Sequence, residues 1–316
     1  MDSHPKFIVV IGASAGGLNA LTQVVRQFNP EIDIAICIVL QLSKKGISDF
    51  LVHRLQKATI LNCRIPSDGE EIKKGHIYIA PPNQHLLIKK NKILISRGPE
   101  ENQWRPSIDV LFRSAAIAYN TAAIGVVLTG LVNDGASGIQ AIKSCGGTCI
   151  VQNPNEAEYP DLPLSILNTM EVDACIPLAQ MGHVITEVVD RKEVHEIEVP
   201  GQMIAEAEIA EKVATGIPVV NHLGDRSVYG CPDCGGGLWE LKSNGKTDRY
   251  RCHIGHSYSE KDLIVKQAEN VESTLWVALR MMEERKNLLL KEQMIMAKKI
   301  ISALHQNTNE KLMTFK

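Results

Sequence analysis

Apolar and polar positions follow one another along the first 190 residues in a pattern that predicts strands and helices in turn. Short apolar runs rich in β-branched residues are typical of buried strands, and we predict them at Ile8–Ile11, Ile32–Leu42, Ala122–Leu128 and Gly147–Val151. Shorter strands are expected at His76–Ala80, Leu86–Lys89 and Lys92–Ser96. Helices are predicted at Leu18–Phe28, Ile47–Leu55, Val110–Tyr119 and Ala136–Ser144. This alternation predicts an α/β fold, a doubly wound, mostly parallel, Rossmann-like sheet, over about residues 5–188.

The remaining residues carry different patterns. Residues 189–225 have weak periodicity and are interpreted as a linker, in which Val194–Pro200 suits an extended tether. From Asp262 to about Leu304 the pattern predicts one long amphipathic helix. Its apolar stripe keeps a 4-3-4-3-4 spacing that later residues extend: Ile264, Ala268, Val271, Leu275, Ala278, Met282, Leu289 and Met296. A helix packed on its own domain and a dimerising coiled coil both fit this stripe. The predicted division is 1–188, 189–225, 226–260 and 261–316.

The turn after the first strand is the first candidate for chemistry. Gly12-x-Ser14-x-Gly16 fits a nucleophile elbow, in which a strand, a tight turn and a helix present a serine above the sheet. A dinucleotide-binding loop is a second interpretation, although Ser14 stands where the second glycine of that motif belongs. A plain strand-to-helix turn with a capping serine is the third.

Polar side chains also follow two other predicted strands. Gln41 lies at the end of the second strand, and Asp134 follows the strand at Ala122–Leu128. Because ligands of such sheets bind at the carboxyl ends of the strands, Ser14, Gln41 and Asp134 are expected to converge there.

Composition narrows the function classes. The chain has 316 residues, a formal net charge of −2 and 44% hydrophobic residues. The interspersed charges argue against nucleic acid and membrane-surface partners. No signal peptide or membrane span is evident, so eight cysteines read as reduced cytoplasmic thiols or metal ligands.

A second candidate site lies near the carboxyl terminus. Cys231-Pro232-Asp233-Cys234 is followed after 17 residues by Cys252-His253-Ile254-Gly255-His256. Paired knuckles of this kind place four soft ligands around one tetrahedral ion. We expect Cys231, Cys234, Cys252 and His256, or less favourably His253, to hold a structural zinc ion in a small zinc ribbon-like module.

Several stretches together resemble the CheB-type protein-glutamate methylesterases of bacterial chemotaxis. They follow the family's order and spacing over about residues 6–185: Gly12–Gly17, Ile79–Leu86, Arg105–Phe112, Leu128–Ala136 and Val151–Pro154. The resemblance implies an α/β serine esterase without a catalytic cofactor, which hydrolyses glutamyl methyl esters on the cytoplasmic segment of chemoreceptors. Many members also deamidate receptor glutamines. Ser14 matches the family nucleophile, and Asp134 matches the acid that orients the histidine. Similar cysteine knuckles before a long helix occur in members that lack a receiver domain.

The family's histidine is missing. The segment that carries it reads Val39-Leu40-Gln41-Leu42 here, so Gln41 stands at the histidine position, and a shift of one residue offers only Leu42. A serine needs a neighbouring base that takes its proton and returns it to the leaving group. A glutamine amide does not take up or release a proton near neutral pH, so it cannot act as this base. The backbone N–H of Ala15 still suits an oxyanion hole. We therefore expect weak or lost esterase activity.

Two further histidines could replace the base, but neither is expected at a strand end: His53 falls in a predicted helix and His85 in a family motif. The elbow begins within ten residues of Met1, so control by a receiver domain in the same chain is not expected. Two hypotheses remain: a feeble or rescued methylesterase or deamidase, and a non-catalytic binding or scaffold module. A homodimer through the carboxyl-terminal helix fits either.

Overall fold

A parallel sheet lies at the centre of the α/β part of the molecule. The computed structural model describes residues 4–41, 48–212, 220–241 and 249–313. Within them, seven strands pair in the order β3-β4-β2-β1-β7-β8-β9, and every pairing is parallel. Their bounds are Phe7–Ala13 (β1), Ile34–Leu40 (β2), Asn62–Arg64 (β3), His76–Ile79 (β4), Ala123–Val127 (β7), Thr148–Gln152 (β8) and Ala174–Ile176 (β9). The order places β1 at the centre.

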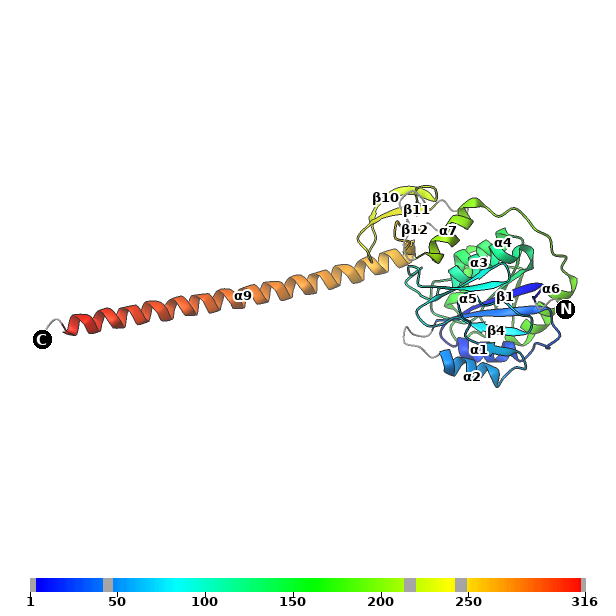
Figure 1. Cartoon of the computed structure of the whole chain (residues 1–316), viewed down its shortest axis with the longest axis horizontal. Coiled ribbons are helices and arrows are strands. Elements are labelled where there is room, and N and C mark those ends of the chain that lie inside the picture. The colour runs from blue at the N-terminus through cyan, green and yellow to red at the C-terminus, as the bar shows by residue number, and fades with distance from the viewer. Residues whose placement is uncertain (1–3, 42–47, 213–219, 242–248, 314–316) are drawn as a thin grey trace. The chain divides into compact units, whose positions relative to one another are not determined.

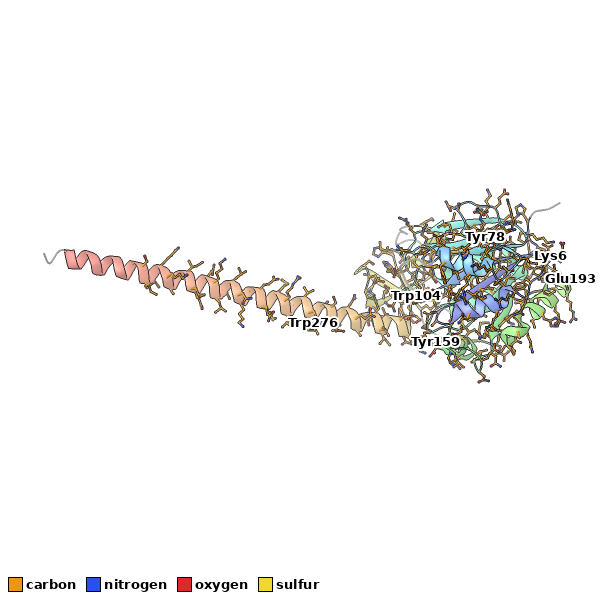
Figure 2. All side chains as sticks on the ribbon, turned by 90° about the horizontal axis from the view of Figure 1, so that it is seen from below. Lys6, Tyr78, Trp104, Tyr159, Glu193 and Trp276 are labelled. Carbon is orange, nitrogen blue, oxygen red and sulfur yellow. The ribbon has the colours of Figure 1, made fainter. Side chains whose placement is uncertain are left out.

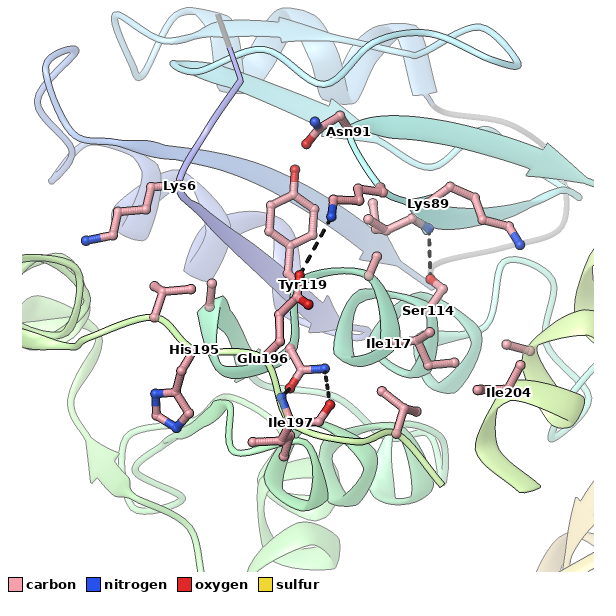
Figure 3. Close-up of a pocket in the computed structure, with 18 of the residues that line it drawn as sticks. Lys6, Lys89, Asn91, Ser114, Ile117, Tyr119, His195, Glu196, Ile197 and Ile204 are labelled. Carbon is pink, nitrogen blue, oxygen red and sulfur yellow. Dashed lines mark hydrogen bonds and ion pairs between the residues drawn. The ribbon is translucent and has the colours of Figure 1, made fainter. Parts of the chain in front are cut away.

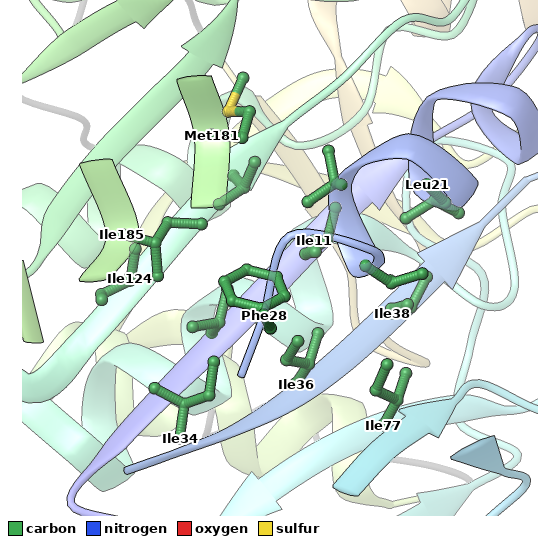
Figure 4. Packing of buried hydrophobic residues seen from close by; sticks show 14 of the residues in the cluster. Ile11, Leu21, Phe28, Ile34, Ile36, Ile38, Ile77, Ile124, Met181 and Ile185 are labelled. Carbon is green, nitrogen blue, oxygen red and sulfur yellow. The ribbon is translucent and has the colours of Figure 1, made fainter. Parts of the chain in front are cut away.

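Helices cover both faces of this sheet (Figure 1). On one face lie Gly17–Val25 (α1), Ser48–Gln56 (α2) and Met181–Arg191 (α6), and on the other lie Ile108–Tyr119 (α3), Ala136–Ser144 (α4) and Asp161–Thr169 (α5). Alternate residues of β1 supply the two cores, Val9 and Ile11 to the first and Ile8 and Val10 to the second. Figure 4 shows the first core, where Leu21 and Ile185 pack over the sheet. The predicted doubly wound fold is confirmed.

Several elements differ from the sequence expectation. The strands His85–Lys89 (β5) and Lys92–Ser96 (β6) form a separate antiparallel hairpin outside the main sheet. A helix, Gly201–Glu211 (α7), lies inside the segment interpreted as a linker. Glu206 and Ile209 of α7 are buried, so this helix packs on the domain. The predicted ends at Leu42 and Ile47 lie outside the described residues.

A second sheet, antiparallel throughout, follows. It has the order β10-β11-β12-β13, with bounds Gly224–Gly230, Gly237–Leu241, Arg249–Cys252 and Ser257–Ser259. Leu238, Tyr250 and Tyr258 form a small core with two of its cysteines.

Buried ion pairs join this sheet to the α/β part. Arg251 of β12 is fully buried, and its guanidinium lies 2.7 Å from Oε1 of Glu101. Arg113 of α3 holds the other oxygen of Glu101 at 2.7 Å. Arg249 donates to both oxygens of Glu206 on α7, at 2.9 and 3.0 Å. Arg113 pairs fork to fork with Glu101, and Arg249 with Glu206, which gives directional as well as electrostatic attachment.

The last helix is long. Glu260–Met313 (α9) has 54 residues, and the chain divides into the compact units Met1–Leu263 and Ile264–Lys316. Figure 2 shows side chains around α9, Trp276 among them. The described stripe residues of α9 are largely exposed, with Leu275 at 64% and Met282 at 70%. Across the described ranges, we find no helix that combines the length and apolar character needed to cross a membrane.

Candidate functional site

Ser14 lies in the turn between β1 and α1, at the carboxyl edge of the sheet. Its backbone N–H donates to Thr129 O at 3.1 Å, which ties the turn to the end of β7. Gly16 caps α1 with φ of +74°, a left-handed conformation that glycine adopts without strain. The Ser14 side chain is 4% exposed, and its hydroxyl donates to the backbone oxygen of Gln41 at 2.9 Å. The predicted nucleophile therefore lies directly beside the residue at the histidine position.

Gln41 follows β2 and lies between the other two predicted residues. Its Nε2 donates to Asp134 Oδ2 at 2.7 Å and to Pro106 O at 2.9 Å. The side chain is buried, and no described residue donates a hydrogen bond to its Oε1. The structure thus brings Ser14, Gln41 and Asp134 together: the backbone oxygen of Gln41 contacts Ser14, and its neutral amide contacts Asp134.

Asp134 lies between β7 and α4 and is surrounded by donors. Its carboxyl accepts from six groups: Gln41 Nε2, Asn102 Nδ2, Ser107 Oγ and the backbone N–H groups of Ile108, Asp109 and Gly135. Two of these N–H groups belong to the first turn of α3, where the helix dipole favours negative charge. Such a set of donors suits a carboxylate that orients a neighbouring side chain.

Burial acts against the charge of this carboxyl. Desolvation raises the pKa of Asp134, as does the nearby Asp109 carboxyl, and the value is about 8 even though hydrogen bonds such as that from Asn102 lower it. No cation is hydrogen-bonded to Asp134 among the described residues. An imidazolium in place of Gln41 would supply one, so the missing histidine also changes the electrostatics of its partner.

Three residues that position Asp134 were not identified from the sequence. Asn102 donates to Asp109 Oδ2 at 2.9 Å as well as to Asp134. Ser107 caps α3 and donates to Asp134 Oδ1 at 3.1 Å. His85 accepts from the Ser107 N–H at 3.3 Å, and its other ring nitrogen lies 2.9 Å from Pro99 O. Ser107 lies in the family motif Arg105–Phe112 and His85 in Ile79–Leu86, but neither motif shows these roles by itself, and Asn102 lies in none of the matching stretches.

Neither of the other candidate histidines lies at the site as a free base. Both ring nitrogens of His85 are engaged, and burial lowers the pKa of His85 to about 4. His53 is exposed on α2. The expectation that neither histidine replaces the base therefore agrees with these positions.

The second sheet reaches the Asp134 site through β13. The Asn102 N–H donates to Ser257 O at 2.8 Å, and the Ser259 N–H donates to Asn102 Oδ1 at 3.2 Å. Asn133, next to Asp134, donates to Ser259 Oγ at 2.9 Å. Asn102 thus connects the antiparallel sheet to the carboxyl that it helps to hold.

The four residues predicted as metal ligands lie together at one end of this sheet. One ligand atom from each of Cys231, Cys234, Cys252 and His256 falls within 4.8 Å of the others. The Cys234 and Cys252 sulfurs are 3.7 Å apart, and His256 Nδ1 is 3.5 Å from Cys252 Sγ. Zn–S bonds of about 2.3 Å in a tetrahedral site place two sulfurs about 3.8 Å apart. The donor set and spacing therefore fit zinc.

A cavity elsewhere in the α/β part contains none of these residues. It has a volume of about 540 Å³ and is lined by α3, the β5–β6 turn, α7 and residues 194–199. Figure 3 shows Tyr119 in the middle of the lining, with Lys6 and Lys89 on either side. This cavity is separate from the Ser14 site.

Known proteins share the α/β part. The family model described as CheB methylesterase matches residues 9–185. A putative protein-glutamate methylesterase/protein-glutamine glutaminase of Leptospira interrogans is 39% identical over 175 residues, which cover 55% of this chain and 90% of the relative. Protein-glutamate methylesterase/protein-glutamine glutaminase of Salmonella typhimurium is 33% identical over 179 residues, which cover 55% of this chain but 51% of that protein. The match thus spans about half the length of the longer relative.

A solved structure agrees with the sequence matches. The crystal structure of the Thermotoga maritima CheB methylesterase catalytic domain aligns with a TM-score of 0.55 and 29% identity, and covers 58% of this chain and 98% of that domain. The family model, the relatives and the solved structure all match the part of the chain that carries Ser14, Gln41 and Asp134. The chain belongs to the CheB methylesterase family.

Proposed function

We propose that the Ser14 site recognises glutamyl side chains of chemoreceptor-type helices and hydrolyses their methyl esters or amides far more slowly than a complete triad. The observation that carries this proposal is that Gln41 contacts both other residues: Ser14 Oγ donates to its backbone oxygen at 2.9 Å, and its side-chain Nε2 donates to Asp134 Oδ2 at 2.7 Å. The matched relatives are named as methylesterases and glutaminases that act on protein glutamate and glutamine.

The reaction assigns each residue a task. Ser14 Oγ attacks the γ-carbonyl carbon of the glutamyl group, and methoxide leaves with a proton as methanol. Water then hydrolyses the acyl-enzyme to give glutamate and free Ser14. The Ala15 N–H is proposed as an oxyanion donor. Serine ester hydrolysis of this kind uses no catalytic cofactor.

Gln41 interrupts the proton transfer. Its Nε2 donates to Asp134 as an imidazole would, but neither amide atom can carry the serine proton to the leaving group. Removing the base from a serine hydrolase costs several orders of magnitude in rate and leaves only the oxyanion hole and binding. A non-catalytic binding module is therefore the second candidate function, and this neutral amide favours it.

Methanol release from a methylated chemoreceptor fragment tests the proposal. We expect a Gln41→His variant to release methanol at least about a thousandfold faster than the parent chain. The double variant Gln41→His/Ser14→Ala is the control and should return to background. A parent chain that already turns over rapidly, with loss on Ser14→Ala, would show that another group acts as the base.

We also propose a structural zinc ion at Cys231, Cys234, Cys252 and His256. Four protein ligands close the site, and such an ion cross-links the ends of β-strands in a small sheet. The module, residues 226–260 in the proposed division, would then act as an attachment between the α/β domain and the helix 261–316. Residues 1–188 remain the proposed esterase domain, with 189–225 between.

The exposed stripe on α9 supports a homodimer formed through this helix. Apolar residues at a heptad-like spacing are stable in water only when a partner covers them. The proposed substrate lies on the cytoplasmic segment of a receptor, so the proposal places the chain in the cytoplasm without membrane insertion.

A further inference from the structure

One buried polar atom of the Ser14 site has no partner in the part of the chain that the structure describes. Gln41 is 3% exposed, and its Oε1 is buried without a hydrogen-bond donor from residues 4–41 or the later described ranges. Buried amide oxygens in proteins are nearly always paired, because an unpaired acceptor has lost its bonds to water and gained none. The free Oε1 therefore needs a physical explanation.

The orientation of the amide is fixed by its surroundings. Nε2 lies 2.7 Å from Asp134 Oδ2 and 2.9 Å from Pro106 O, and both of these oxygens are acceptors. A flipped amide would set Oε1 against Pro106 O, which is an acceptor whatever the protonation state of Asp134, so Nε2 is the atom that faces Pro106 O and Asp134. Oε1 is then the side-chain atom that diverges from Asp134.

The proposed nucleophile does not satisfy Oε1. The Ser14 hydroxyl has one proton, and it donates that proton to the backbone oxygen of Gln41 at 2.9 Å. Since no described residue supplies the donor, a bound ligand is a candidate source of it.

We propose that Gln41 makes this site selective for the carboxamide of a glutamine side chain over a glutamyl methyl ester. The inference rests on the proposed function for the location of the glutamyl group at Ser14. In a serine hydrolase the residue at the base position faces the leaving group, because the base protonates it. A carboxamide places an N–H donor there, which pairs with Oε1.

The other forms of the side chain lack that donor. A methyl ester presents oxygen lone pairs to the lone pairs of Oε1, and a glutamate adds negative charge near Asp134. Sites built to hydrogen-bond an N–H reject analogues without it, because the protein group is then left unpaired. Gln41 is thus a specificity-determining residue in this hypothesis.

Binding of matched peptides to the full chain tests the proposal. The probes are one chemoreceptor-derived peptide with glutamine, glutamyl methyl ester or N,N-dimethylglutamine at the modified position, measured by calorimetry. Mass spectrometry checks that each peptide stays intact. The dimethyl amide keeps the carbonyl but has no N–H. We expect the glutamine peptide to bind about tenfold more tightly than either of the others.

A Gln41→Met variant supplies the matched protein, since methionine is similar in length and accepts hydrogen bonds only weakly. The preference of this variant for the glutamine peptide over the other two peptides should fall to about twofold or less. Equal or tighter binding of the ester by the parent, or an unchanged preference in the variant, would overturn the proposal. If no peptide binds the parent while Gln41→His releases methanol, this inference fails and the proposed function stands. If Gln41→His is also inert, both fail.

Discussion

At the scale of single residues, the site differs from a serine esterase chiefly in charge. Asp134 is held by six donors, but its partner Gln41 is neutral. A serine–histidine–aspartate triad balances the acid with an imidazolium during the reaction. Here the Asp134 carboxyl is buried without a cationic partner in the described part of the chain, so ionising it lowers the stability of the folded state.

This imbalance predicts a pH dependence of stability. The pKa of Asp134 is about 8 in the folded state, above the ordinary value of 3.8 for an aspartate. Between these values the folded chain binds a proton that the unfolded chain releases, so the free energy of unfolding contributed by Asp134 falls as pH rises from about 4 to 8. Asp134→Asn has no such proton to lose. Its stability relative to the parent should therefore rise over that range in urea unfolding. The exposed Asp190→Asn serves as the surface control for the substitution itself.

Sequence reasoning reached the central residues of the site because parallel strands end at one edge. Ser14, Gln41 and Asp134 each follow a strand, so their proximity could be expected from strand periodicity alone. The orphaned Oε1 of Gln41 could not, since it depends on where Pro106 O lies. Asn102 was also missed, because its bond to Ser259 joins residues 157 apart without any periodic signal.

At the scale of elements, the attachment of the antiparallel sheet depends on a few buried guanidiniums. The segment around α7 looked like a linker because its apolar pattern is weak, yet Glu206 of α7 is buried against Arg249. Burial alone would raise the pKa of Glu206, but Arg249, Arg113 and Arg251 lower it to about 2. The stability from this carboxylate should therefore be lost as pH falls from about 4.5 through 2.

Truncation of one guanidinium tests this attachment. Arg251→Met leaves Glu101 buried with one cation fewer, and breaking such a pair costs about 3–5 kcal/mol. Urea unfolding measures the loss. Arg226→Met, at an exposed position of β10, should change stability by less than about 0.5 kcal/mol. Equal effects of the two variants would contradict a structural role for the buried pairs.

The Cys/His cluster predicts that the antiparallel sheet also depends on a bound zinc ion. We expect one zinc ion per chain by elemental analysis, and a Cys234→Ser variant should lose most of it. Cys175→Ser, at an exposed cysteine of β9, should keep the metal. Chelation of the parent should shift the fluorescence of Trp239, which is buried in β11. One zinc ion per chain in the Cys234→Ser variant would rule out this cluster as the zinc site.

At the scale of the whole molecule, α9 predicts self-association. The stripe that includes Val271, Leu275 and Met282 is exposed, and a second copy offers the same stripe in return. Sedimentation equilibrium of the full chain should give a dimer. Leu275→Lys/Met282→Lys should give a monomer, while Glu283→Lys/Lys286→Glu, off the stripe, should stay dimeric. A monomeric parent at high micromolar concentration would contradict the coiled-coil interpretation.

The contact of Gln41 with Asp134 also has a genetic consequence. Glutamine and histidine codons differ only in their third base, so one point mutation separates the two side chains at this position. Ser14, Asp134 and the donors around it already lie together, so under the proposed function a histidine at position 41 supplies the base in a single change. If that proposal holds, selection for ester hydrolysis in cells should recover histidine codons at position 41 first.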